Sequence, residues 1–188
     1  MVARSVRTLS LPLHTPRLLI RDLEPRDEDA YAALYANRQV HRHLPFGARD
    51  QAGARRQLAG ILAAPKRARR DAWELGVELQ VSPGLIGACD LTWHSSREAE
   101  IGYLLDPAYW GTGLGIELVR ALLAAAFTEL GVARVLAHVE VSNRRSIELL
   151  ERAGLAWEAT LRRFAQVDSR WWDVHLYSVT REQWNSDP

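Results

Sequence analysis

The sequence is poor in sulfur: it contains one cysteine, Cys89, and one methionine among 188 residues. A single cysteine excludes an intrachain disulfide and a zinc site built from several thiolates. The chain also has little net charge, because 24 Lys and Arg residues stand against 23 Asp and Glu residues, which gives +1. This balance offers no electrostatic reason to expect direct nucleic-acid binding or attachment to an acidic membrane surface.

Long hydrophobic runs are missing as well. The longest apolar-rich segment, residues 116–130, is interrupted by Glu117, Arg120, Thr128 and Glu129, so it is too short and too charged to cross a bilayer. The N-terminus has no apolar segment of the secretory-signal kind. We therefore expect a cytoplasmic protein. The 47% hydrophobic and 25% charged fractions are those of a globular protein, and the length is typical of one domain.

Hydrophobic periodicity predicts a single α/β domain with a mixed, mostly antiparallel sheet flanked by helices. Strands are expected over residues 17–23, 72–81, 85–93, 98–105, 134–141, 156–166 and 171–179, and helices over 27–36, 50–63, 113–130 and 143–153. The helix over 113–130 connects two strands as a crossover, which predicts a parallel pair there and antiparallel pairs elsewhere.

A glycine-rich turn, Tyr109-Trp-Gly-Thr-Gly-Leu-Gly115, precedes the longest predicted helix. Glycines at a helix N-terminus let backbone N–H groups approach a phosphate, although such a turn can also simply connect a strand to a helix tightly. The pattern G-x-G-x-G differs from the G-x-G-x-x-G of dinucleotide-binding folds. It also lacks the G-K-[ST] of a P-loop, so NAD and ATP fit poorly.

Residues 100–115, EIGYLLDPAYWGTGLG, resemble the acetyl-CoA motif of the GNAT N-acetyltransferases, whose loop reads Q/R-x-x-G-x-G/A. Trp110 replaces the Gln or Arg, while Gly113 and Gly115 match. Residues 143–155 resemble the next motif of that family, N-x-x-S followed by G-F, with Leu155 in place of Phe. Segments 15–21, 37–45 and 172–177 are similar to the Rim-type branch, which acetylates the N-termini of ribosomal proteins.

The resemblance implies a GNAT-like domain over residues 15–184, with an N-terminal extension at 1–14 and a tail at 185–188. It implies acetyl-CoA as co-substrate and direct transfer of the acetyl group to a primary amine, with a protein or peptide N-terminal α-amine as the first expectation. Two alternatives stay open: an antibiotic, amino acid or polyamine acceptor, and a binding module without turnover. The family often dimerises through its late strands, so a homodimer stays open too.

The resemblance also assigns cofactor-binding roles. The backbone N–H groups of the loop would bind the pyrophosphate, and Leu104 and Leu105 would pair with the pantetheine arm as an added strand. Asn143 would contact the arm or the amine, although it fits a plain helix N-cap equally well. The loop residues are Trp110, Gly111, Thr112, Gly113, Leu114 and Gly115.

For catalysis, Glu100 is the first candidate base because it lies on the strand that enters the cofactor motif; a solvated strand acid is the alternative. His138 and Glu140, two residues apart on another strand, come next. Many relatives protonate the leaving thiolate with a tyrosine seven residues after the motif asparagine. That position is Leu150 here, so Ser146 is the hydroxyl available for this role.

Two further chemistries rank low. Cys89 would allow a ping-pong route through an acetyl-cysteine, but strand cysteines are mostly small buried apolar residues. His41 and His43 have metal-ligand character, but no third ligand is near in the sequence, so we expect no metal site.

Overall fold

The computed structural model describes residues 8–44, 50–64, 70–95, 97–167 and 169–186. These residues form an eight-stranded sheet in the order β1-β2-β3-β4-β5-β6-β8-β7. All neighbouring strands are antiparallel except β5 and β6, so the predicted fold class and the single parallel pair are confirmed. The strands are β1 (Leu13–His14), β2 (Leu18–Asp22), β3 (Ala72–Leu79), β4 (Ser82–Ser95), β5 (Glu98–Leu105), β6 (Arg134–Glu140), β7 (Ala156–Val167) and β8 (Arg170–Thr180).

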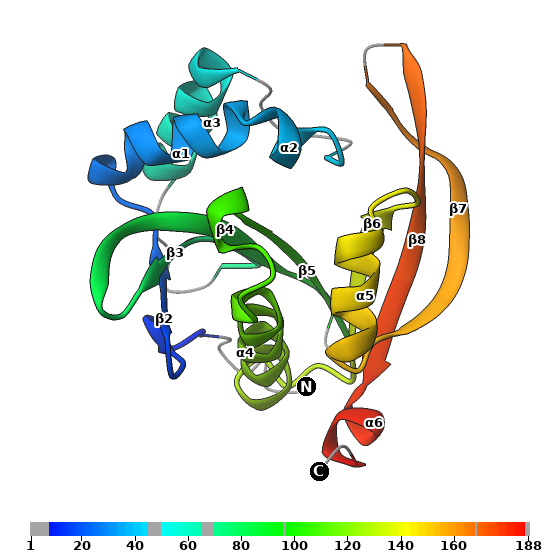
Figure 1. Cartoon of the computed structure of the whole chain (residues 1–188). Coiled ribbons are helices and arrows are strands. Elements are labelled where there is room, and N and C mark those ends of the chain that lie inside the picture. The colour runs from blue at the N-terminus through cyan, green and yellow to red at the C-terminus, as the bar shows by residue number, and fades with distance from the viewer. Residues whose placement is uncertain (1–7, 45–49, 65–69, 96, 168, 187–188) are drawn as a thin grey trace.

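Helices cover both faces of the sheet (Figure 1). Helices α1 and α3 pack against one face around Ala88 of β4, while α4 and α5 lie on the opposite face. The helical elements are η1 (Pro25–Asp27), α1 (Glu28–Ala36), α2 (Arg38–His41), α3 (Gln51–Ala63), η2 (Pro107–Tyr109), α4 (Leu114–Thr128), α5 (Arg144–Arg152) and α6 (Arg181–Ser186).

Helix α4 forms the centre of the larger hydrophobic core. Its apolar residues recur at helical spacing, and Leu118 and Leu122 are completely buried against the sheet. A glycine that follows the helix, Gly131, has a φ of +68°, a conformation that an L side chain rarely adopts. A second, smaller cluster joins α1 and α3 to β4 through Tyr31 and Leu58.

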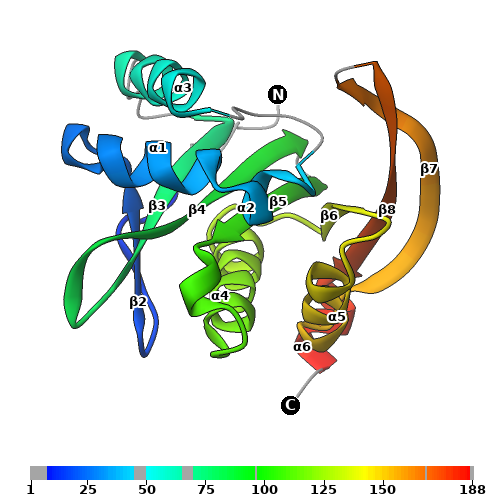
Figure 2. The same ribbon diagram turned by 45° about the horizontal axis from the view of Figure 1, so that its top comes forward.

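The sheet divides between β5 and β6. Their pairing covers only Glu98, Ala99 and Glu100 of β5, opposite residues 134–136 of β6, although β5 continues to Leu105 and β6 to Glu140. Figures 1 and 2 show the two parts of the sheet diverging from this point, with α4 beside one part and α5 beside the other. The division leaves one backbone edge of β5 facing an opening.

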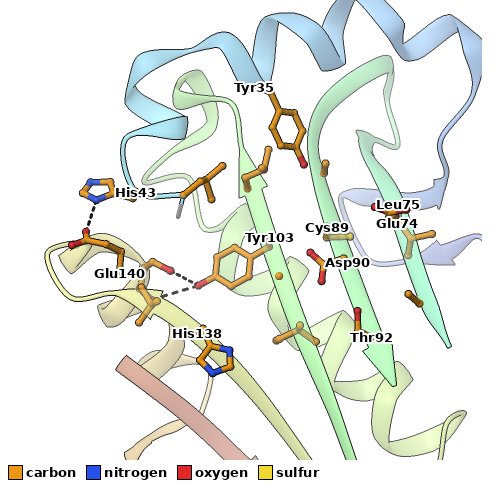
Figure 3. Close-up of a pocket in the computed structure, with 18 of the residues that line it drawn as sticks. Tyr35, His43, Glu74, Leu75, Cys89, Asp90, Thr92, Tyr103, His138 and Glu140 are labelled. Atoms are coloured by element: carbon orange, nitrogen blue, oxygen red, sulfur yellow. Dashed lines mark hydrogen bonds and ion pairs between the residues drawn. The ribbon is translucent and has the colours of Figure 1, made fainter. Parts of the chain in front are cut away.

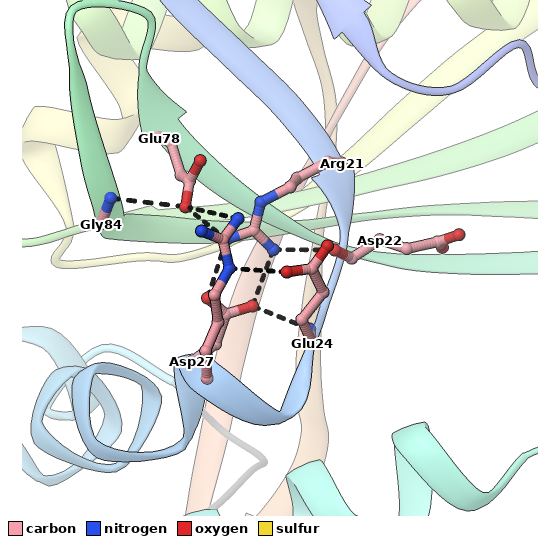
Figure 4. Close-up of polar contacts among 7 residues, drawn as sticks. Arg21, Asp22, Glu24, Asp27, Glu78 and Gly84 are labelled. Atoms are coloured by element: carbon pink, nitrogen blue, oxygen red, sulfur yellow. Dashed lines mark hydrogen bonds and ion pairs between the residues drawn. The ribbon is translucent and has the colours of Figure 1, made fainter.

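A buried ion cluster lies beside strands β2 and β3 (Figure 4). The guanidinium group of Arg21 donates to both oxygens of Asp27, at 2.7 and 2.8 Å, and also binds Glu78. These hydrogen bonds lower the pKa of Glu78 below its usual value. Burial acts to raise the pKa of Asp27, but the bonds from Arg21 outweigh it and the net shift is downward. The cluster ties β2, the η1 turn and β3 together.

Three details differ from or lie beyond the sequence-based expectations. The hairpin turn is at Gln80 and Val81, and β4 already begins at Ser82. Leu13 and His14, assigned above to an extension, pair with β2. Pro45, the last residue of the segment 37–45 that is similar to the Rim-type branch, lies outside the described residues. Within the described part of the chain, no helix is long and apolar enough to cross a membrane.

Candidate active site

Strand alternation gathers polar side chains on the face of the sheet that α1 covers. Glu74 of β3 lies opposite Asp90 of β4, and Asp90 lies opposite Gly102 of β5. Because directly paired residues carry their side chains on the same face, these groups meet. With Tyr35 of α1 and His138 of β6, they line a pocket of about 350 Å³ (Figure 3). The pocket lies where β5 and β6 part.

Asp90 is a pocket residue that sequence analysis missed. Its carboxylate lies over Gly102, where a Cβ atom would come within 2.2 Å of Oδ1. Glycine at this position is therefore what leaves room for the carboxylate. Burial, followed by the nearby charges of Glu100 and Glu74, raises the pKa of Asp90 to about 6. A charged residue within the otherwise uncharged run from Pro83 to Trp93 was the available signal.

Glu100 lies beside the pocket and not in its lining. Its Oε1 is 2.7 Å from Nδ1 of His138, and its Oε2 is 3.0 Å from Nε2 of His94. Burial acts to raise the pKa of Glu100, but the two histidines outweigh it and the net shift is downward. The Glu100 carboxylate is thus bound on both oxygens, and it fixes the orientation of the His138 ring, which lines the pocket.

Ser146, in the first turn of α5, lies in the pocket beside a tyrosine that sequence analysis missed. Its Oγ is 2.7 Å from the hydroxyl of Tyr103. Burial raises the pKa of Tyr103 well above its usual value, so the phenol stays protonated. Leu150 packs in the hydrophobic core. Asn143 caps α5, since its side chain accepts a bond from the Ser146 N–H (3.3 Å).

The remaining candidates have structural partners. Nδ1 of His43 is 2.9 Å from a Glu140 oxygen that also accepts a bond from Ser142 (2.6 Å). Cys89 lines the pocket, but burial raises the pKa of its thiol far above the usual value, which disfavours the nucleophilic thiolate. The described residues contain no group of three His, Cys, Asp or Glu side chains that could hold a metal ion.

The glycine loop has the backbone that its sequence requires. Gly111 and Gly113 have φ values of +78° and +84°. Gly113 is the N-cap of α4 and provides no side-chain cap, so the first-turn N–H groups keep their capacity to bind an anion. Two arginines flank the loop: Arg17 donates to the Thr112 carbonyl (3.0 Å), and Arg145 stacks 4.5 Å from the ring centre of Trp110.

The backbone of β5 alternates between its two neighbours. The N–H of Asp106 donates to Ile86 of β4 (2.8 Å). Leu104 therefore has its backbone groups toward β4, and Leu105 has them toward the opening. There the Leu105 carbonyl accepts a bond from the Trp110 indole (2.8 Å). A free strand edge beside an uncapped helix N-terminus fits the extended arm and the pyrophosphate of acetyl-CoA.

Sequence comparisons agree with this geometry. The acetyltransferase (GNAT) domain family matches residues 17–156. The protein named "Uncharacterized N-acetyltransferase YoaA" of Bacillus subtilis (strain 168) is 30% identical, over 90% of this chain and 96% of its own length. That named "Putative ribosomal N-acetyltransferase YdaF", from the same organism, is 29% identical, over 90% of this chain and 94% of its own.

Solved structures share the fold. One from Chromobacterium violaceum, described as a probable acetyltransferase of the GNAT family, has a TM-score of 0.80 at 25% identity, over 99% of this chain and 95% of that one. A Mycobacterium smegmatis RimJ with CoA-disulfide (88% and 83% covered) and a Vibrio cholerae spermidine N-acetyltransferase with CoA and spermine (92% and 100%) each have a TM-score of 0.75 at 21% identity, which shows the fold alone. The chain belongs to the GNAT acetyltransferase family and is an acetyl-CoA-dependent N-acetyltransferase.

Proposed function

We propose that this enzyme acetylates the α-amine at the N-terminus of a protein or peptide. The observation that carries the proposal is the position of the pocket, which lies at the free edge of β5 where Tyr103, Ser146 and His138 meet. An α-amine has a pKa near 7.7–8.0, so it is substantially neutral at pH 7–8, whereas a lysine amine, near 10.4, is almost fully protonated. The name of the relative YdaF points to the same acceptor class.

The glycine loop and the edge of β5 would hold acetyl-CoA, which supplies the acetyl group as a thioester. Backbone N–H groups from Gly111 to Gly115 bind the pyrophosphate, whereas the Trp110 N–H donates to the Pro107 carbonyl (3.2 Å). Arg145 places a guanidinium group where the family's loop has Gln or Arg. Leu105 presents its backbone to the arm, and Leu104 packs its side chain against the pocket.

We assign a role to each polar side chain near the reacting atoms. The hydroxyl of Ser146, held by Tyr103, donates toward the sulfur of the cofactor. Asn143 places Ser146 by capping the helix that carries it. Glu100 acts through His138 as a positioning residue, because its carboxylate holds that ring and does not itself line the pocket.

A second acceptor class has an observation in its favour. Glu74, Asp90 and Glu140 all line the pocket, and three carboxyl groups suit a small amine that carries several positive charges, such as a polyamine. A pocket lined by uncharged groups would not favour an amine with several positive charges. The N-terminus of a peptide carries at most one positive charge, whereas a polyamine carries several, so the two acceptor classes can be separated by experiment.

The test compares acceptors at equal concentration. CoA release is measured from pH 6.5 to 9 with peptides that carry a free α-amine and no lysine, with the same peptides formylated at the N-terminus, and with spermidine. The proposal predicts turnover of the free peptides and none of the formylated ones. Turnover of spermidine alone would overturn it and establish the second acceptor class.

A further inference from the structure

The pocket contains a carboxylate whose hydrogen-bonding capacity is unused. Within the described part of the chain, no group donates a hydrogen bond to Asp90 (Figure 3). Both oxygens of Glu100, in contrast, are bound by histidines. Glu140 is likewise bound, by His43 and Ser142. A carboxylate accepts a proton best when its lone pairs are not already bound to donors.

We propose that Asp90, and not Glu100, takes the proton from the amine as that amine attacks the acetyl group. The inference rests on the proposed transfer to an amine, but not on which amine it is. Two positions support it: Asp90 lines the pocket together with Tyr103 and Ser146, whereas Glu100 does not, and the Asp90 carboxylate lies over Gly102. Tyr103 in turn holds Ser146, so the proton acceptor and the hydroxyl pair share one cavity.

The surroundings of Asp90 raise its pKa, which suits a group that accepts a proton. Burial disfavours the ionised form of Asp90, and Glu100 of β5 and Glu74 of β3 add negative charge nearby; together they raise the pKa of Asp90 to about 6. Tyr31 and Tyr35 of α1 also face this region, and burial keeps both phenols protonated. On the β6 side lies His138. A general base works best when its pKa lies near the operating pH.

The proton and electron balance is simple. The lone pair of the neutral amine forms the new N–C bond as the C–S bond breaks, and one N–H proton passes to the Asp90 carboxylate. The sulfur leaves with the bonding pair and takes up a proton through Ser146, while Asp90 returns its proton to solvent. The products are an amide and a thiol, with no other reactant consumed.

The first test measures the acid itself, without turnover. In protein labelled with ¹³C at aspartate carboxyls, the resonance missing from D90N identifies Asp90. We expect this resonance to titrate near pH 6 in the wild type, and at lower pH in Glu74→Gln, because one neighbouring negative charge is gone. Titration near 3.9, the ordinary value for aspartate, would overturn the proposal.

The second test measures kcat against pH for whichever amine the wild type acetylates. The wild-type kcat should fall as Asp90 becomes protonated, below about pH 6. D90N should lower kcat by about 10²–10⁴-fold and lose this acidic limb, with KM changed only a few-fold. Asp29→Asn is the matched control, since Asp29 is a highly exposed carboxylate that does not line the pocket; it should behave as the wild type.

Two results would contradict the proposal. If D90N raises KM and leaves kcat unchanged, Asp90 merely holds the acceptor's charge. If D90N keeps the acidic limb and His138→Gln loses it, His138 is the base. Gly102→Ala provides a second variant should D90N unfold. The Asp90 carboxylate is still present in this variant, but the added Cβ of residue 102 pushes it out of its position. We expect a kcat loss there too. Turnover of spermidine without peptides would refute the α-amine proposal and leave this test intact.

Discussion

The hydroxyl groups of Tyr103 and Ser146 lie 2.7 Å apart and join β5 to α5 where the sheet divides. The tyrosine that many relatives place seven residues after the motif asparagine is absent, and that position, Leu150, packs in the core. A phenol is nevertheless beside the motif serine, and it comes from the neighbouring strand. We therefore treat the two hydroxyls as one hydrogen-bonded pair that faces the acetyl-transfer site.

Ser146→Ala should lower kcat by about 10–100-fold with little change in KM, because the lost hydroxyl acts on the breaking bond and not on ground-state binding. Tyr103→Phe should give a smaller loss, since Ser146 remains but loses its partner. Steady-state kinetics at saturating acetyl-CoA measure both. Equal kcat values for Ser146→Ala and the wild type would remove Ser146 from the reaction.

Gly113→Ala should weaken acetyl-CoA binding about tenfold or more. The φ of Gly113 is +84°, where an L residue costs about 1–2 kcal/mol and shifts the loop N–H groups. Gly60→Ala is the matched control: Gly60 lies in α3, and a Cβ there would meet no atom within 4 Å. Calorimetry should give an unchanged Kd for the control. An unchanged Kd for Gly113→Ala would show that the loop does not bind the cofactor.

The elements of the fold were predictable because their hydrophobic periods are regular. Leu118 and Leu122 recur at helical spacing, and the helix they mark lies at the crossover that predicted the one parallel pair. The buried cluster of Arg21, Asp27 and Glu78 was not predictable, because charged residues in a strand ordinarily indicate solvent. Along the sequence, Asp27 lies six residues from Arg21 and Glu78 lies 57 residues from it.

The site was partly predictable for a related reason. Asn143 and Ser146 belong to one local sequence pattern, and both line the pocket. The glycine loop is also a local pattern, but its residues do not line that pocket. Asp90 becomes a site residue through pairing between strands, which brings it over Gly102. Tyr103 becomes one through the approach of α5 to β5, which brings it next to Ser146. Tyrosines 31, 35 and 103 also line the pocket, and they come from two separate elements, α1 and β5.

Arg21→Met should destabilise the protein by about 3–5 kcal/mol at pH 7, because the buried carboxylates of Asp27 and Glu78 lose the guanidinium that binds both of them. Arg21 lowers the pKa of both Asp27 and Glu78, so its contribution is present above their ordinary pKa, about 4, and is lost as pH falls through the lowered values. The deficit should therefore shrink toward pH 4, where the variant's carboxyls become protonated. Urea unfolding at both pH values measures it; a deficit independent of pH would contradict the ion cluster's role.

Arg145→Ala should raise the Kd for acetyl-CoA about tenfold at low salt, and the effect should weaken as salt increases, because the proposed binding mode sets the guanidinium beside Trp110 near the anionic part of the cofactor. Arg144→Ala, its exposed neighbour on α5, is the control and should leave Kd unchanged. If both variants weaken binding equally, the general charge of α5 is responsible and the Trp110 contact is not.

Transfer to an α-amine is tested most directly by incubating the enzyme with acetyl-CoA and a lysine-free peptide at pH 7.5, and locating the product by tandem mass spectrometry. We expect one acetyl group, placed on the α-nitrogen of the first residue, together with one CoA released per peptide. Undiminished acetyl-CoA and unmodified peptide, beside rapid acetylation of spermidine in a parallel reaction, would contradict it.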